Sequence, residues 1–394
     1  MIEDLLVPSV TYQVKIITST EEFAILEKTW NKLLSSSPAD NYFLRWEWLW
    51  NWWQVYSNKG DELRIIIIER GDGIVGIAPF YSRKRLLGRI FPVRRMMFLG
   101  TQENGEGDVC SDYMNAIYKE GEAQPIIERI FETITGNNLC DEIYLSKINK
   151  CSETFPLLKK EAEKYNYLLK IDNEFSSPYI RLPKTWDEYM KTLSKSMRYN
   201  IRNERKKLQN YPQIQFKRIE QGKELESGYN ELVRLHQSRW ETRGYKGSFA
   251  DKRFKMFHYE MMRMMMENGL LQLWFLSDQG TNYAAIYNIS YNKKIYFYQS
   301  GIDLKEKRAA WGILLISHCI EEAIQQRMEE YDFLPKGGND DYKDRFAKDH
   351  REVVDIYLAS HWLVKNFVTT TELARTAYHR FKPYLIYARK KSGN

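Results

Sequence analysis

The sequence predicts an α/β protein of mixed sheets that is composed of two similar halves. Two apolar, strand-like runs flank the turn at residues 278–281, where Gly280 supplies the positive φ that a β-hairpin turn needs. A third strand (KIYFYQSG), a helix-length run and a short strand (EYDFLP) follow. The same order of hairpin, strand, helix and strand occurs at residues 63–146 and 270–334, which indicates a structural repeat. We therefore expect one mixed sheet in each half.

The length of 394 residues also favours two domains, since single cores tend to stop growing near about 250–300 residues. We place the N-terminal half at residues 1–172, the C-terminal half at 173–360 and a basic, aromatic extension at 361–394. The link between the halves is expected at residues 173–186, which contain Ser-Ser-Pro and Leu-Pro. The extension could lie on the body of the protein, on a membrane surface or on nucleic acid.

The N-terminal half is predicted to contain two helices followed by a mostly β segment. A strand-like VKIITS precedes a helix at residues 23–34, and a second helix carries a stripe of aromatic and apolar side chains that predicts core packing. That stripe consists of Trp46, Leu49, Trp53 and Tyr56. LRIIIIE and IVGIAPFY predict a hairpin, RRMMFLG a strand, residues 126–134 a helix and DEIYLS a last strand. The acidic loop NGEGDVCSDY would repel a pyrophosphate, so this half is not expected to bind a cofactor that carries one.

The C-terminal half opens with a helix that separates charged from apolar residues. Cations recur at helical spacing on one face, opposite an apolar face. These cations are Lys195, Arg198, Arg202 and Arg205. The basic face is either a solvated surface or an anion-binding surface, and the sequence leaves both open. The methionine-rich run at residues 254–265 also keeps helical spacing, which predicts a core helix.

Gly312 is predicted to lie near the start of a helix, because Ile313, Ile316 and Ile320 recur on one helical face after it. The unpaired N–H groups of a helix start attract anions, and a basic turn that includes Lys307 precedes it. Two interpretations fit this turn, a phosphate cradle and a capped helix with a solvated basic loop.

The order of these elements resembles the GNAT N-acetyltransferase fold. The closing segment YDFLPKGGNDDYKDRFA resembles the D-F-x-x-G-x-[DE]-x-Y-K-x-x-[FW] signature of its CelD/BcsL-like branch, which is associated with cellulose and exopolysaccharide biosynthesis. LHQSRWETRGYKGSF and FLRWEWLWNWW resemble two further segments of that branch, so the resemblance covers roughly residues 40–350. The branch is similar to the FemABX peptidyl transferases, which carry two GNAT-like halves. The resemblance therefore implies tandem GNAT-like domains with a FemABX-like duplication.

The resemblance implies transfer of an acyl group from acetyl-CoA or another acyl-CoA to an amine or hydroxyl, in cell-envelope or polysaccharide biosynthesis. The acyl group would lie along the backbone of the strand KIYFYQSG, and the pyrophosphate at the basic glycine turn. The residues assigned to this donor are Tyr298, Gln299, Ser300, Lys307, Arg308 and Gly312. The nearest fit to the family motif [QR]-x-x-G-x-[GA] is Lys307-x-x-Ala310-x-Gly312, which contains the bulky Trp311.

Acyl transfer to an amine needs a base, and Asp332 and His236 are the candidates. Asp332 matches the family signature. Alternatively, Asp332 could be a structural cap of the loop that follows it, and His236 could be a histidine on a helix surface with its hydrogen bonds satisfied. Lys343, beside Tyr342, is predicted to neutralise a phosphate or carboxylate of the substrate. The predicted substrate-binding residues are Arg239, Trp240, Arg345, Arg198 and Arg202.

Other classes of protein find no support in the sequence. The four cysteines lack C-x-x-C spacing, and neither an H-E-x-x-H motif nor a P-loop occurs, so no metal site, hydrolase or kinase is predicted. The acidic first segment and the lack of an apolar run of about 18 residues predict a cytoplasmic protein. The net charge of +7 favours anionic ligands, and the basic extension leaves peripheral membrane contact open.

Two alternatives to the acyl-CoA enzyme stay open. A FemABX-like aminoacyl-tRNA-dependent transferase would bind RNA phosphates with the basic helix at residues 195–205. A non-catalytic GNAT-like scaffold would instead bind a partner through its aromatic N-terminal half. The acceptor is expected to be a small or sugar-linked molecule, and the oligomeric state does not follow from the sequence.

Overall fold

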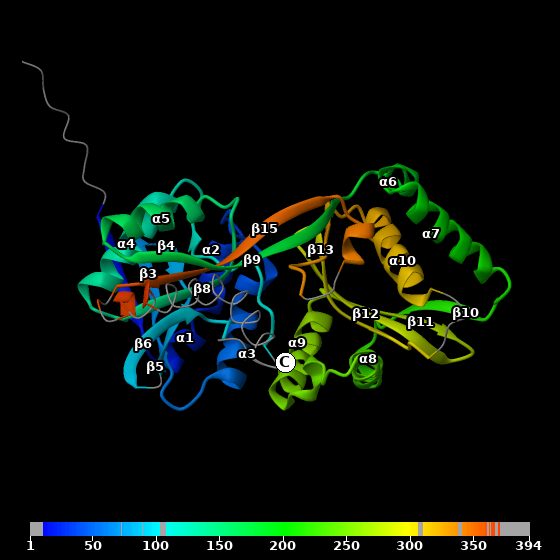
Figure 1. Ribbon diagram of the computed structural model, residues 1–394, viewed down its shortest axis with the longest axis horizontal. Coiled ribbons are helices and arrows are strands. Elements are labelled where there is room, and N and C mark those ends of the chain that lie inside the picture. The colour runs from blue at the N-terminus through cyan, green and yellow to red at the C-terminus, as the bar shows by residue number, and fades with distance from the viewer. Residues whose placement is uncertain are drawn as a thin grey trace, which may run out of the picture.

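The computed structural model describes residues 11–71, 73–88, 90–102, 108–305, 310–337, 341–360, 362, 364–366 and 369–370. The N-terminal half contains β1 (Tyr12–Ile17), α1 (Thr20–Ala24), α2 (Glu27–Leu34), η1 (Tyr42–Leu44), α3 (Trp46–Tyr56), β2 (Glu62–Leu63), β3 (Ile65–Arg70), β4 (Gly73–Ala78), β5 (Phe80–Leu87), β6 (Phe91–Phe98), β7 (Ile117–Tyr118), α4 (Ala123–Gly136), β8 (Glu142–Asn149) and α5 (Thr154–Lys164). The C-terminal half contains α6 (Trp186–Thr192), α7 (Lys195–Leu208), β10 (Ile214–Arg218), α8 (Gly222–Glu241), η2 (Ser248–Ala250), α9 (Lys252–Glu267), β11 (Leu271–Asp278), β12 (Thr281–Tyr291), β13 (Lys294–Ile302), α10 (Trp311–Gln325), β14 (Glu330–Asp332) and η3 (Lys343–Arg345). Two long strands, β9 (Leu168–Arg181) and β15 (Asp349–Ala359), run from one half to the other (Figure 1).

One large sheet passes through both halves. Within the described residues, eleven strands pair in the order β10-β11-β12-β13-β14-β9-β15-β8-β6-β5-β2, and β1, β3, β4 and β7 form a separate four-stranded sheet. We expected one sheet for each half, and the structure differs because β9 is 14 residues long. At about 3.3 Å per residue it spans roughly 46 Å, enough to pair with β14 in one half and β15 along most of its length.

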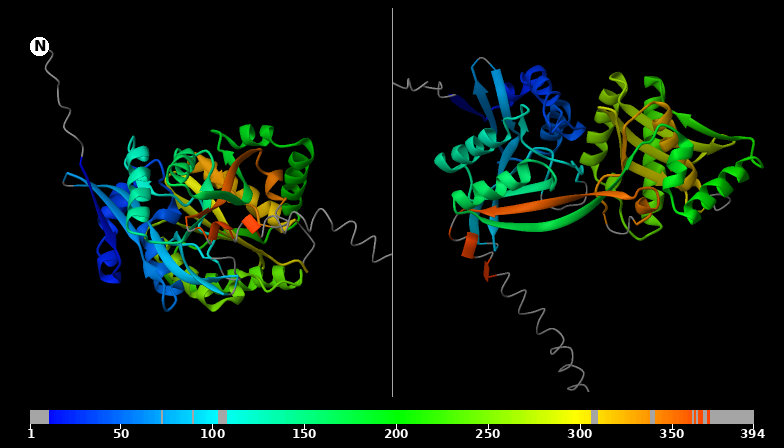
Figure 2. Two further views of the ribbon diagram at one scale, coloured as in Figure 1. Left: turned by 60° about the vertical axis from the view of Figure 1, so that its left-hand side comes forward. Right: turned by 90° about the horizontal axis from the view of Figure 1, so that it is seen from above.

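The strand β9 crosses the border that we placed between residues 172 and 173. Residues 173–181 of the expected link are strand, and β15 also pairs with β8, so the last residues before 360 lie in the N-terminal part of the sheet. Seen from above, the two strands lie side by side along the molecule (Figure 2). The division of the chain into separate units remains a prediction.

The two halves repeat the same connection of strands. In the N-terminal half α4 joins the parallel strands β6 and β8, and in the C-terminal half α10 joins the parallel strands β13 and β14. Each first strand of these pairs is also antiparallel to the strand before it, β5 and β12 respectively. The predicted duplication is confirmed.

The aromatic helix α3 packs inside the protein, as its pattern predicted. Trp48 and Trp52 have no exposed surface, and Trp46 and Trp53 retain less than a tenth of theirs. The Asn51 side chain donates a hydrogen bond of 3.2 Å to the carbonyl oxygen of Phe257 in α9. Because α9 belongs to the C-terminal half, α3 helps to hold the halves together.

A second core cluster lies in the C-terminal half, where α6, α7 and α10 contribute to it. Met197 and Ile201 of α7 are buried there against α10, which confirms the predicted apolar face of α7. None of the helices within the described ranges is long and apolar enough to cross a membrane.

Candidate functional site

A cavity of about 630 Å³ opens between β12, β13 and the start of α10. Its walls are largely apolar, with Ala284 and Ile286 from β12 and Ile313 and Ile316 from α10. Five residues that we assigned from the sequence line it: Ser300, Gly312, Arg239, Tyr342 and Arg345. Lys307 and Arg308, which we also assigned to the donor, lie outside the described residues.

The strands β13 and β14 separate beside this cavity. Their parallel pairing ends where Tyr296 meets Asp332, whereas β13 continues to Ile302. A register shift against β12 leaves Tyr298 without a partner, because Tyr287 pairs with Gln299 and the next residue pairs with Phe297. The edge of β13 that faces β14 is therefore open from residue 297 onward among the described strands, and its backbone can bind a carbonyl group.

The side chains of the predicted acyl-binding strand point to different surroundings. Ser300 lines the cavity, and its hydroxyl accepts a hydrogen bond of 3.0 Å from Arg239. Tyr298 is buried, with its hydroxyl donating to the carbonyl oxygen of Val109 and lying 3.3 Å from Nε2 of His258. Since Val109 belongs to the N-terminal half, the hydrogen bond of Tyr298 links β13 to that half.

The start of α10 holds a carboxylate. The backbone N–H of Ala310 donates to Oε2 of Glu204 at 2.9 Å, and Lys207 pairs with the other oxygen at 2.6 Å. Glu204 is buried and also lines the cavity. Trp311 is buried as well, and its indole stacks on Tyr283 with ring centroids 5.0 Å apart. Because this carboxylate accepts the N–H of Ala310 and places a negative charge at the helix start, it opposes binding of the pyrophosphate of coenzyme A there.

Several cations also line the cavity. Arg239 donates to Ser300 and its guanidinium lies 5.6 Å from the ring centroid of Tyr342, and Arg345 is exposed beside it. Arg243 and Lys207 complete the basic lining. An anionic group could thus bind at the mouth of the cavity, whose inner walls are apolar.

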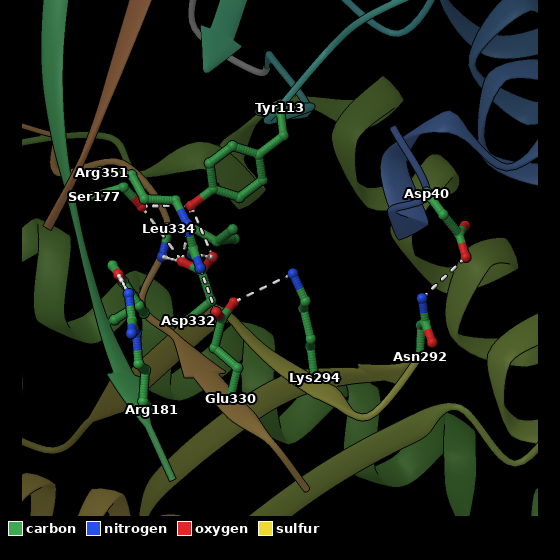
Figure 3. Close-up of polar contacts among 11 residues, drawn as sticks. Asp40, Tyr113, Ser177, Arg181, Asn292, Lys294, Glu330, Asp332, Leu334 and Arg351 are labelled. Atoms are coloured by element: carbon green, nitrogen blue, oxygen red, sulfur yellow. Dashed lines mark hydrogen bonds and ion pairs between the residues drawn. The ribbon is translucent and has the colours of Figure 1, made fainter. Parts of the chain in front are cut away.

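Asp332 lies at the junction of the two halves and outside the lining of this cavity (Figure 3). Its carboxylate accepts hydrogen bonds from the hydroxyl of Tyr113 (2.8 Å), the backbone N–H of Leu334 (2.8 Å) and Ser177 Oγ (3.3 Å). Arg351 Nη1 forms an ion pair with it at 2.8 Å. Burial raises the pKa of Asp332, and the charge of Arg351 opposes that rise. This surrounding satisfies the carboxylate, and its role as a base remains a prediction.

Lys343 is buried, and it lies eleven residues beyond the end of β14. Its ammonium donates to the carbonyl oxygen of Phe333 at 2.9 Å, at the beginning of the loop that leads to Tyr342. The two neighbouring residues Tyr342 and Lys343 therefore lie in different places. Tyr342 lines the cavity, and the side chain of Lys343 reaches the residue after the end of β14.

The buried His236 is hydrogen-bonded to the half-buried Trp240 one turn later on α8. The Trp240 indole N–H donates to Nε2 of His236 at 3.0 Å, and the histidine is 1% exposed. Burial lowers the pKa of His236 to about 4, so its imidazole is neutral near pH 7. Neither residue lines the cavity, and α8 packs so closely on β13 that a Cβ at Gly301 would lie 2.5 Å from the backbone nitrogen of His236.

Arg198 and Arg202 of α7 do not line the cavity. They line a separate surface depression with Asp187, Met190 and Lys191, and Arg198 donates to the carbonyl oxygen of Leu193 at 2.6 Å. Their substrate-binding role remains a prediction.

Sequence reasoning missed two acidic residues of the N-terminal half, Asp108 and Asp112. Asp112 is 4% exposed, and its carboxylate has no hydrogen-bond partner among the described residues. Burial raises the pKa of Asp112 to about 8, against the lowering effect of Lys147 and Lys343. Burial likewise raises the pKa of Asp108 to about 7. The acidic run NGEGDVCSDY was visible in the sequence, but only its packing against β13 and Lys343 indicates a use.

The family model described as "Acetyltransferase (GNAT) domain" matches residues 195–344. A solved structure titled as FemX is similar over 87% of this chain and 96% of that chain, with 9% identity and a TM-score of 0.58. A conserved protein of unknown function from Bacteroides thetaiotaomicron is similar over 88% of this chain and 100% of that chain, with 11% identity and a TM-score of 0.53. At such identities these likenesses concern the fold alone, and no curated protein sequence matches the chain. Residues 195–344 are thus similar to a GNAT acetyltransferase domain, and the fold of the chain as a whole is like that of FemX.

Proposed function

We propose that the protein is an N-acyltransferase that moves an activated acyl group from a donor in the cavity to an amine at the junction of the halves. The observation that carries this proposal is the open edge of β13. On one side of that strand Ser300 lines the cavity, and on the other Tyr298 contacts the loop that holds Asp108 and Asp112. A donor and an acceptor could therefore approach the same backbone from opposite sides.

The donor side supplies binding and charge stabilisation. The apolar walls suit an extended arm, and Arg239 and Arg345 suit an anionic group at its end. The backbone N–H groups on the open edge of β13 would donate to the acyl oxygen as it becomes an oxyanion. Removing one such donor typically costs about 10²–10³-fold in rate, so this edge would supply a large part of catalysis.

The acceptor side supplies a base. Asp112 would take a proton from the acceptor's ammonium, and the free amine would attack the acyl carbon to form a tetrahedral intermediate. The intermediate would then expel the donor's leaving group, a thiolate or an alkoxide, which takes up a proton. A carboxyl with a pKa near 8 is a stronger base than an ordinary aspartate, which favours proton removal from an amine.

Two classes of acyl donor are candidates. Acyl-CoA remains the expectation from the GNAT domain, with the apolar cavity for its arm, although Glu204 occupies the helix start where the pyrophosphate was expected. The same glutamate favours a second candidate, a FemABX-like transferase that uses aminoacyl-tRNA. Lys195 and Arg202, both exposed on α7, would then contact RNA phosphates. A cell-envelope or polysaccharide setting, with a sugar-linked amine as acceptor, rests on the sequence resemblance.

The test compares donors directly. The purified protein is incubated with acetyl-CoA, longer acyl-CoA or aminoacyl-tRNA and a panel of amines, and amide products are measured by mass spectrometry. Binding of each donor is measured in parallel by thermal stabilisation. Product from acyl-CoA supports the first candidate, and product only from aminoacyl-tRNA with salt-dependent binding supports the second. Binding without any turnover across the panel would replace both with the non-catalytic scaffold.

A further inference from the structure

The hairpin formed by β5 and β6 ends in an exposed apolar tip. Leu86, Ile90 and Phe91 are 57%, 72% and 47% exposed, although they lie within six positions of one another. Leu87, which is paired with Phe91 in the β5–β6 register, and Val93 are buried, so the exposed apolar side chains are confined to the end of the hairpin. An apolar group of this kind on a protruding hairpin is typical of an interaction site rather than of a scattered surface residue.

The two strands behind the tip are rich in cations. Residues 83–95 contain six lysines and arginines and no acidic residue, and carboxylates of other segments pair with Arg83, Arg85 and Arg95. Lys84 lies directly opposite Arg94 in the β5–β6 register, an arrangement that is destabilising without a neutralising partner. Arg94 lies 3.5 Å from Asp141, whereas Lys84 is exposed and has no ion pair within the described ranges.

The tip lies at the far end of the large sheet, away from the cavity. Figure 1 shows β5 and β6 at the opposite end of the molecule from α7 and α10. Arg95 of β6 pairs with Glu142, the first residue of β8, and Glu142 also pairs with Ala359, the last residue of β15. Residues 86–91 therefore extend beyond the ends of β8 and β15. Trp362, which is 63% exposed, follows Ala359 at the same end of the sheet. Tryptophan favours the interface between lipid and water.

We propose that this hairpin tip docks on an anionic lipid bilayer. Its apolar side chains enter the headgroup region while the cations beside them contact lipid phosphates. A second copy of this chain fits the tip less well, because two identical tips would bring Lys84 and Arg94 against their own counterparts. The docking is separate from the acyl-transfer site and does not depend on it.

The experiment is co-sedimentation of the full chain with vesicles. Wild-type protein is expected to bind vesicles of phosphatidylcholine mixed with phosphatidylglycerol, and to bind pure phosphatidylcholine at least about tenfold more weakly. The double variant Ile90→Ser, Phe91→Ser is expected to lose about tenfold or more of the binding, and Lys84→Gln several-fold. Raising the salt concentration should weaken binding, since it screens the charges.

The control is Ile25→Ser, which removes an isolated apolar side chain, 81% exposed, from another place on the same half. It should bind vesicles like wild type, and equal melting temperatures would show that all variants fold. Unchanged binding by the double hairpin variant would overturn the proposal and point to the basic C-terminal extension. A wild-type dimer in light scattering that the double variant abolishes, without vesicle binding, would assign the tip to a second copy and also overturn it.

Discussion

Tyr113 and Asp332 lie 219 residues apart in the chain, yet the tyrosine hydroxyl donates a hydrogen bond of 2.8 Å to the aspartate carboxylate. Tyr113 is the last residue of the acidic run NGEGDVCSDY in the N-terminal half, and Asp332 ends β14 in the other half (Figure 3). The same loop carries Asp112, so this bond also fixes the residue that we propose as the base. The junction of the halves is thus a hydrogen-bonded structure, built around one buried carboxylate.

Tyr113→Phe should destabilise the protein. The substitution keeps the ring but removes a hydroxyl from a buried carboxylate, which typically costs about 1–3 kcal/mol in the free energy of unfolding. Urea denaturation measures this loss. Tyr245→Phe, at a side chain that is 64% exposed, is the control and should leave stability unchanged. Equal stabilities of the two variants would mean that the junction does not depend on this hydrogen bond.

Asp112→Asn should remove the acidic limb of the pH–rate profile. Burial raises the pKa of Asp112 to about 8, so kcat/KM of the wild type should rise with pH through that region as the carboxylate forms. The variant should lose about 10²–10⁴-fold in kcat/KM and show no such rise. Asp341→Asn, at a carboxylate side chain that is 90% exposed, should keep the wild-type profile. If Asp112→Asn kept it as well, another group would be the base.

Asp112 should lower the stability of the wild-type protein at alkaline pH. The folded-state pKa of Asp112 is raised above its ordinary value of 3.8, so the folded protein holds this proton more tightly than the unfolded chain. Stability contributed in this way is present below about pH 4 and is lost as the pH rises toward 8. Asp112→Asn should therefore melt at a higher temperature than wild type at pH 9, and the advantage should disappear at acid pH. An advantage that does not vary with pH would contradict the raised pKa.

Lys343→Met should shift the pH–rate profile upward. The ammonium of Lys343 lowers the pKa of Asp112 against the effect of burial, and its removal lets that pKa rise. At pH 7 kcat should fall by roughly 10–10²-fold, with partial recovery at higher pH. The exposed Lys348, changed to Met, is the matched control. If stability and activity fell in parallel and the pH–rate profile did not shift, the role of Lys343 would be only structural, through its hydrogen bond to Phe333.

Glu204→Gln should strengthen binding of an anionic donor. Glutamine retains an oxygen for the N–H of Ala310 but removes the negative charge from the start of α10. We expect the affinity for acetyl-CoA, measured by calorimetry, to rise about fivefold or more. The control is Glu322→Gln. Glu322 lies on α10 but outside the cavity lining, so this change should leave the affinity for acetyl-CoA unaltered. An unchanged affinity in Glu204→Gln would place the anion of the donor at Arg239 and Arg345.

Local patterns in the sequence were sufficient for the elements and for part of the cavity. Strand runs, helical spacing and the turn at Gly280 predicted β11–β13 and α10, because these features depend on neighbours close in the chain. Gly312, which lines the cavity, was placed in the same way at a helix start, whereas Ser300 was assigned from the family resemblance. The repeat of the two halves also followed from the order of elements alone.

Contacts between distant segments decided the rest. Nothing local to Asp112 shows that folding buries it near Lys343, and nothing local to Glu204 shows that it meets Ala310 across 106 positions of the chain. The length of β9 was likewise hidden, because its polar middle part, residues 172–177, lacks the alternation that marks a half-buried strand. A pKa, a helix cap or a shared sheet arises from desolvation and partners that only the packed chain brings together, so the sequence by itself determined the elements, and the tertiary structure determined which charges meet.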